Sequence, residues 1–176
     1  MSKLLCKCGE GMSKSDCPSP NSLYIFYKDE VDSAIQHDPN IALHSFLSGW
    51  DDNKRCHRTY SLRKEPVDYW YCTECKRIYE VQLIPGGRWL RVFNRIDVAV
   101  KDDYSKWKRI YVLTDCDTDA ATEENYDIRL VDYLNRHDSI HFYLAHDEKN
   151  ACALDVATGT VLYSYELEES WTSPES

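Results

Sequence analysis

Two close pairs of cysteines restrict the fold of this chain more than any other feature of its sequence. One residue separates Cys6 from Cys8, and two residues separate Cys72 from Cys75. A turn that carries two thiolates at such a spacing supplies half of the four donors that a tetrahedral zinc ion needs. The pairs therefore predict one Zn²⁺ site with these four ligands. Four thiolates leave no open coordination position, so the predicted zinc is structural.

The other four cysteines leave alternatives open. Cys17 could replace one ligand of the first pair, whereas Cys56, Cys116 and Cys152 are isolated and are expected to be structural. The competing interpretation is that all the cysteines are reduced and partly buried without a metal, because free cysteine is among the residue types most often buried.

The N-terminal residues indicate a compartment. Only two adjacent leucines precede the first charged and cysteine residues, whereas a secretory signal needs an apolar run of roughly 7–15 residues. No stretch approaches the ~18 uninterrupted apolar residues of a membrane span. We therefore expect a cytoplasmic protein that does not enter a membrane. Thiols stay reduced in the cytoplasm, and cysteine pairs there mark metal sites more often than disulfides.

Hydrophobic patterning predicts a mixture of helices and strands. In the first hundred residues we expect a strand or helix entry at 23–27, helices at 28–36 and 39–49, a loop at 51–66, and a β-hairpin formed by 77–84 and 88–96. In the remainder we expect a strand at 109–114, a helix at 122–136 capped by Thr122, and strands at 139–145, 150–156 and 160–168 joined as a meander.

The expected fold class is therefore α+β: a zinc-ribbon-like β-hairpin region with inserted helices, followed by a strand, a helix and a three-stranded antiparallel meander. We expect a zinc-ribbon-like region at 1–100 with its helical insertion at about 22–66, an α+β region with a C-terminal β-meander at 101–170, and a loose tail at 171–176.

The cysteine motifs resemble those of the zinc-ribbon superfamily. The first is Cys6-x-Cys8-Gly9, and the second is Cys72-x-x-Cys75, which is followed by Arg77-Ile78-Tyr79. The chain looks most like small bacterial proteins that open with C-x-C-G and complete the site tens of residues later. The resemblance covers residues 4–9 and 69–84, and it implies a strand–turn–strand unit that a metal ion fastens to a second turn.

Charge is distributed unevenly along the chain, whose net charge is −9. Residues 54–95 sum to +6 and residues 107–176 to −10. Acidic surface speeds association with a cationic partner. The sequence therefore predicts a non-enzymatic interaction module that binds a basic protein. By type alone it is similar to acidic immunity proteins that neutralise toxin domains, including those of contact-dependent growth inhibition. The candidate contact residues are Asp115, Asp117, Asp119, Glu123, Glu124 and Asp127. The alternative is a nucleic-acid-binding or regulatory protein that uses the basic 54–95 segment.

Catalytic motifs do not favour an enzyme. The chain has six glycines and lacks G-x-S-x-G, a glycine-rich phosphate loop and H-E-x-x-H. Asp115, Asp117 and Asp119 resemble the magnesium-binding opening motif of haloacid-dehalogenase-like phosphatases. However, no later lysine and acidic pair in a strand–helix unit follows them. We therefore interpret the three aspartates as an acidic capping loop before the helix at 122–136.

Overall fold

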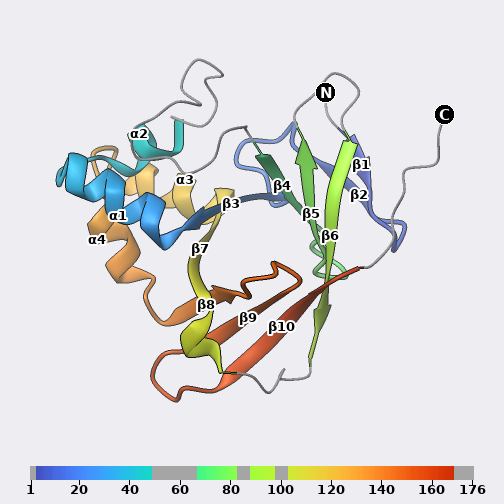
Figure 1. Cartoon of the computed structure of the whole chain (residues 1–176). Coiled ribbons are helices and arrows are strands. Elements are labelled where there is room, and N and C mark those ends of the chain that lie inside the picture. The colour runs from blue at the N-terminus through green and yellow to red at the C-terminus, as the bar shows by residue number, and fades with distance from the viewer. Residues whose placement is uncertain (1–2, 49–66, 83–87, 98–102, 169–176) are drawn as a thin grey trace.

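The structure is a computed structural model that describes residues 3–48, 67–82, 88–97 and 103–168 (Figure 1). Its central element is a closed barrel of eight antiparallel strands in the order β10-β6-β5-β4-β3-β7-β8-β9. The barrel strands are β3 (Ser22–Tyr27), β4 (Val67–Tyr71), β5 (Ile78–Gln82), β6 (Arg88–Ile96), β7 (Lys108–Thr114), β8 (Ile140–Leu144), β9 (Asn150–Asp155) and β10 (Val161–Leu167).

Two pairings between distant segments close the barrel. Strand β3 pairs with β7 over five residues, and β10 pairs with β6, where Tyr165 lies opposite Arg95. The predicted regions 1–100 and 101–170 each contribute four strands to this one barrel. The expected boundary near residue 100 therefore falls between β6 and β7.

Helices cover the outer face of β3 and β7 (Figure 1). They are α1 (Lys28–His37), α2 (Leu43–Ser48), α3 (Asp115–Glu124) and α4 (Leu130–Arg136), and a short 3₁₀ helix, η2 (Tyr104–Lys106), precedes β7. Phe26 of β3 and Phe46 of α2 form the centre of this contact, with ring centroids 4.7 Å apart. No helix in the described part of the chain is both long enough and apolar enough to cross a membrane.

A two-stranded hairpin covers another part of the outer face. Strands β1 (Lys3–Leu5) and β2 (Gly11–Ser13) pair only with each other. Residues of this hairpin pack against the outward side chains of β4, β5 and β6, and the resulting cluster includes Met12, Trp70, Tyr79 and Val92. The barrel therefore carries apolar residues on its outer face beneath both the helices and the hairpin.

The predicted fold class is wrong. The hairpin β5–β6 and the strands β8, β9 and β10 lie where the sequence predicts strands, but they do not form a ribbon region followed by a separate meander. They are neighbours in one closed barrel, and residues 22–27, expected within a helical insertion, form barrel strand β3. Strand β10, the last strand of the predicted meander, pairs with β6. The hydrophobic pattern of neither segment predicts this pairing.

Two helix predictions are also corrected. The helix expected at 122–136 is two helices, α3 and α4, separated by a turn at residues 125–129. The acidic segment expected as a capping loop is the beginning of α3, whose N-cap is Thr114, because its hydroxyl accepts a hydrogen bond from the Asp117 amide at 3.0 Å. Helix α2 begins at Leu43, later than the proline signal indicates. The expected loop at 51–66 and tail at 171–176 lie outside the described residues.

Candidate metal centre

Two turns bring the predicted cysteine ligands to one place. The first turn connects β1 to β2, and there the Gly9 amide donates to the Cys6 carbonyl at 2.9 Å while Gly9 has φ +95°. A residue without Cβ adopts this conformation at little cost. The second turn connects β4 to β5, where the Lys76 amide donates to the Cys72 carbonyl at 2.9 Å. The metal centre thus spans the hairpin and the barrel.

The geometry of the four sulfur atoms suits one metal ion. The Sγ atoms of Cys6, Cys8, Cys72 and Cys75 all lie within 4.8 Å of one another. Cys6 and Cys75 are 3.4 Å apart, and Cys8 and Cys72 are 3.6 Å apart, so neither pair is a disulfide. Zinc with four sulfurs at about 2.3 Å holds them about 3.8 Å from one another. The four cysteines can therefore bind a metal ion.

Burial and hydrogen bonding affect the four thiols differently. Burial opposes ionisation of Cys6, but hydrogen bonds from the Cys8 backbone and the Tyr79 hydroxyl outweigh it and lower the pKa of Cys6 to about 6. Burial dominates at Cys72, which is fully buried, and raises its pKa to about 12. Cys8 is exposed, so one side of the cluster faces solvent.

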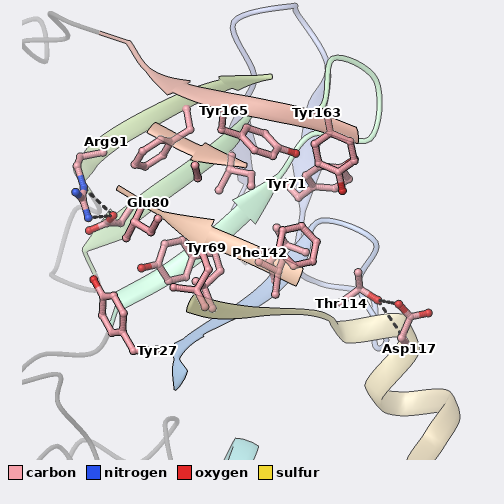
Figure 2. A pocket seen from close by; sticks show the side chains of 18 residues that line it. Tyr27, Tyr69, Tyr71, Glu80, Arg91, Thr114, Asp117, Phe142, Tyr163 and Tyr165 are labelled. Atoms are coloured by element: carbon pink, nitrogen blue, oxygen red, sulfur yellow. Dashed lines mark hydrogen bonds and ion pairs between the residues drawn. The ribbon is translucent and has the colours of Figure 1, made fainter. Parts of the chain in front are cut away.

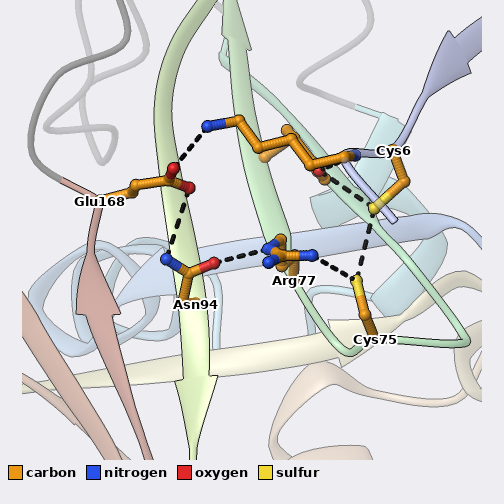
Figure 3. A network of polar contacts seen from close by, with 7 residues as sticks. Cys6, Cys75, Arg77, Asn94 and Glu168 are labelled. Carbon is orange, nitrogen blue, oxygen red and sulfur yellow. Dashed lines mark hydrogen bonds and ion pairs between the residues drawn. The ribbon is translucent and has the colours of Figure 1, made fainter. Parts of the chain in front are cut away.

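Polar contacts connect the cysteines to the barrel (Figure 3). The Tyr79 hydroxyl lies 3.0 Å from Cys6 Sγ and accepts a hydrogen bond from the Lys7 amide, also at 3.0 Å. Arg77 Nη1 donates to Cys75 Sγ at 3.4 Å, and Arg77 Nε donates to Asn94 Oδ1 on β6 at 2.6 Å. These contacts orient two of the four sulfurs, one from Tyr79 of strand β5 and one from Arg77 directly before it.

The network continues to the end of β10. Asn94 Nδ2 donates to Glu168 Oε2 at 3.4 Å, and Lys7 Nζ donates to Glu168 Oε1 at 2.5 Å (Figure 3). The hydrogen bond from Lys7 lowers the pKa of Glu168, against the opposing effect of burial. Sequence reasoning did not assign Tyr79, Asn94 or Glu168 to the site. Only the adjacency of residues 77–79 to the second cysteine pair could have indicated part of it.

The remaining described cysteines lie apart from the cluster. The four grouped cysteines do not include Cys17 and Cys116, which are exposed, or Cys152, which is buried in β9. Burial raises the pKa of Cys152 to about 12. Cys56 lies outside the described residues.

The predicted acidic contact residues occupy α3 and the turn after it, and they differ in environment. Asp115 is engaged within the fold, since its carboxylate accepts hydrogen bonds from the Ser19 amide at 2.7 Å and the Tyr24 hydroxyl at 3.1 Å. Asp117 accepts from the hydroxyl of Thr114. Asp119 is half-buried, and Glu123, Glu124 and Asp127 are exposed. These last three carboxylates are the most available to a partner.

An exposed aromatic residue lies among these acids. Tyr126 is 66% exposed, and its ring stacks on His44 of α2 with centroids 4.1 Å apart. The Tyr126 carbonyl lies 2.9 Å from His44 Nδ1, so both its ring and its backbone contact α2. We define the acidic surface as Glu123, Glu124, Tyr126 and Asp127.

The basic segment is engaged within the fold wherever its side chains are described. Arg77 contacts Asn94 and Cys75, Arg91 pairs with Glu80, and Arg95 stacks on the ring of Tyr163 with its guanidinium carbon 4.0 Å from the ring centroid. Nucleic-acid binding through residues 54–95 stays a prediction from charge alone.

No curated protein and no solved structure matches the chain. Residues 2–115 match a family described as a domain of unknown function, DUF8617. The match covers more than half of the chain and includes all four cysteines of the cluster and strands β1 to β7. The chain therefore belongs to the DUF8617 family.

Proposed function

We propose that this protein is a non-enzymatic cytoplasmic binding module, in which one structural zinc ion fastens the N-terminal hairpin to a β-barrel and the acidic surface binds a basic protein. The observation that carries the binding role is the position of Tyr126, an exposed ring in a segment whose exposed neighbours in the sequence are Glu123, Glu124 and Asp127. An immunity-type protein that neutralises a toxin domain is the function that fits these features best.

Zinc is the metal that this donor set favours. Four cysteine sulfurs are soft donors, and hard cations such as Mg²⁺ and Ca²⁺ prefer oxygen ligands. Strands β1 and β2 are three residues each, and a two-stranded hairpin of that length is not stable alone in water. A metal ion that links Cys6 and Cys8 to Cys72 and Cys75 holds this hairpin on the outer face of the barrel.

The zinc proposal is tested by elemental analysis of the purified native chain. We expect one zinc per chain in the wild type and in Cys116→Ser, which changes an exposed cysteine outside the cluster. Cys72→Ser removes a fully buried ligand, so it is expected to lose the zinc and much of the stability. Metal-free wild-type protein that is fully folded would contradict the proposal.

The acidic surface provides two features of a protein interface. Tyrosine is enriched among residues that dominate binding energy, because a large ring buries area at low entropic cost. The stacking of Tyr126 on His44 restricts the ring before binding. No lysine or arginine occurs from residue 110 to residue 128, so this segment carries only negative charge, which attracts a cationic partner.

Within the described residues, the nearby arginines reduce the negative charge of the acidic surface only slightly. Arg136 lies 3.8 Å from Glu124, and both side chains are more than half exposed, so the pair is weak. Arg129 is held by Asp132 of α4 at 2.7 Å rather than by the acidic surface. Glu123 and Asp127 form no ion pair with any described residue.

The binding role is tested with the protein encoded directly upstream of this chain, because toxin and immunity genes are commonly adjacent. The purified proteins are titrated by calorimetry at low and high salt. We expect a complex whose affinity falls as salt is added. We expect Tyr126→Ala to weaken it by at least about 30-fold, which corresponds to ~2 kcal/mol.

Charge reversal on the acidic surface provides the matched comparison. Glu123→Lys and Asp127→Lys are expected to weaken the complex, whereas Glu166→Lys, an equal change at an exposed acid of β10, is expected to leave it unchanged. Absence of a complex, or equal weakening by all three variants, would contradict the assignment of this surface.

A further inference from the structure

The barrel encloses a cavity of about 300 Å³ on the inner face of its strands. Most of its wall is hydrocarbon from all sides of the barrel: Leu23, Ile25, Ile78, Phe93, Ile110, Val112, Phe142, Leu144 and Ala151. Asp117, at the start of α3, is the one exposed residue among the described lining residues, so the cavity reaches solvent beside it. The metal cluster and the acidic surface lie outside this cavity.

One end of the cavity is closed by a saturated ion cluster. Arg91 Nε and Nη2 contact Glu80 Oε2 at 2.8 and 2.6 Å, and Arg91 Nη1 donates to Glu148 Oε2 at 2.8 Å. The Tyr27 hydroxyl donates to the other oxygen of Glu148 at 2.9 Å. Arg91 is thus paired with two carboxylates and offers no uncompensated positive charge to a ligand.

The other end gathers three tyrosines, Tyr71, Tyr163 and Tyr165 (Figure 2). The rings of Tyr163 and Tyr165 meet edge to face with centroids 5.9 Å apart. Tyr165 is only 8% exposed, yet none of the three hydroxyls forms a hydrogen bond with a described residue. Burial raises the pKa of Tyr71 and of Tyr163, so these hydroxyls remain protonated donors. All three tyrosines line the cavity, so their hydroxyls can donate to an acceptor on a bound molecule.

We propose that the barrel binds one uncharged, mainly hydrocarbon small molecule of one or two rings, with an oxygen acceptor directed at the hydroxyls of Tyr71, Tyr163 and Tyr165. Apolar cavities with a few convergent polar groups are the usual form of small-molecule sites. A cavity of about 300 Å³ lies at the lower end of the range for small-molecule sites, which suits a ligand of one or two rings.

The charges around the cavity favour a neutral ligand. Arg91 is neutralised by Glu80 and Glu148, and Arg95 is not among the residues that line the cavity. The Arg95 guanidinium lies over the ring of Tyr163. A carboxylate in the cavity would lack a dedicated cation, and burying an unpaired charge is costly. A neutral carbonyl or ether oxygen needs only the donors that the tyrosines supply.

The test uses three naphthalene probes of nearly equal size: 2-acetonaphthone, its hydrocarbon analogue 2-ethylnaphthalene, and the anion 2-naphthoate. Binding to the full-length protein is followed by calorimetry and by probe fluorescence. We expect one ketone per chain, with the ketone bound at least about threefold more tightly than the hydrocarbon because it accepts a tyrosine hydrogen bond. We expect the anion to bind more weakly than the ketone.

Two variants locate the site. Tyr165→Phe keeps the ring and removes a hydroxyl, so the preference for the ketone over the hydrocarbon should shrink, while Tyr133→Phe, a buried tyrosine of the helical cluster, should leave it unchanged. Ala151→Leu adds side-chain volume to the cavity wall and should abolish binding of all three probes. Far-ultraviolet circular dichroism and melting temperature show whether each variant is folded.

Three results would overturn the proposal. They are absence of ketone binding to the folded protein, ketone binding that persists in folded Ala151→Leu, and tighter binding of the anion than of the ketone. None of them depends on the zinc ion or on the acidic surface, so this site and the proposed function can fail separately.

Discussion

The hydroxyl of Tyr79 makes a sharp test of the metal centre. The ring is fully buried in the cluster beneath the hairpin, and the hydroxyl joins two parts of the first cysteine turn. It contacts Cys6 Sγ at 3.0 Å and accepts from the Lys7 amide at 3.0 Å. Tyr79→Phe removes both hydrogen bonds and leaves the packing of the ring in place.

The structure sets the expected magnitude. Two hydrogen bonds, each worth about 0.5–1.5 kcal/mol net, give a loss of about 1–3 kcal/mol in the free energy of unfolding. Groups that hydrogen-bond metal ligands typically contribute 10–100-fold to metal affinity, which corresponds to about 1.4–2.8 kcal/mol. The range estimated from the hydrogen bonds overlaps the range estimated from metal affinity. We therefore expect Tyr79→Phe to weaken zinc binding by one to two orders of magnitude.

Zinc affinity is measured by competition with a chromophoric chelator, and stability by urea denaturation of the zinc-loaded protein. Tyr133→Phe is the matched control, because Tyr133 is equally buried but lies among the helices. The argument is refuted when Tyr79→Phe retains wild-type zinc affinity, or when the control loses as much affinity.

Three further substitutions test the barrel and its helices. Phe46→Ala removes a fully buried ring that packs on Phe26. We expect denaturant unfolding to show a loss of about 3–5 kcal/mol in the free energy of unfolding, and a loss below about 1 kcal/mol would argue against this core. Thr114→Ala removes the N-cap of α3 and should cost about 1 kcal/mol by the same measurement; no change would contradict the cap. Burial opposes ionisation of Glu148, but hydrogen bonds from Arg91 and Tyr27 hold its pKa below the usual 4.5. The folded state therefore gains stability from Glu148 above about pH 4.5 and loses it as the pH falls through the lowered pKa. Because Glu148→Gln removes this titrating group, it should flatten this part of the curve of unfolding free energy against pH. A curve identical to that of the wild type would contradict the pairing.

The clustering of the four cysteines was predictable because its signal is local. Two thiolates within one turn can supply half of a metal site, so the spacing predicted which cysteines should lie together. The four sulfurs do lie together, although Cys8 and Cys72 are 64 positions apart in the sequence. The groups that orient them were missed, because Tyr79 and Asn94 come from strands whose register the spacing does not specify.

The barrel was not predictable from the same reasoning. Closure depends on pairing between β6 and β10, segments about seventy residues apart, and no local turn signal connects them. Hydrophobic alternation and turn residues predicted the positions of β8, β9 and β10. However, three strands of an open meander and three neighbouring strands of a closed barrel have the same local sequence pattern. The helix expected at 122–136 failed for a related reason: Thr122 resembles a cap, but Thr114 lies at the end of β7 and caps α3 there.

Strands β4, β5 and β6 also lack the polar–apolar alternation that would identify their faces. Tyr69 and Tyr71 line the cavity, while Trp70 between them packs under the hairpin. On β5, Ile78 faces inward and Tyr79 faces the cysteines. Both faces are covered, so apolar and aromatic residues occur on both, and the alternation does not show which face is inside. The same alternation separates the two candidate sites: along β4 and β5, alternate residues face the cavity or the cluster beneath the hairpin, which includes Cys6 and Cys72. A substitution at Tyr71 should therefore alter ligand binding, and one at Tyr79 should alter zinc binding, although both tyrosines flank the same cysteine turn.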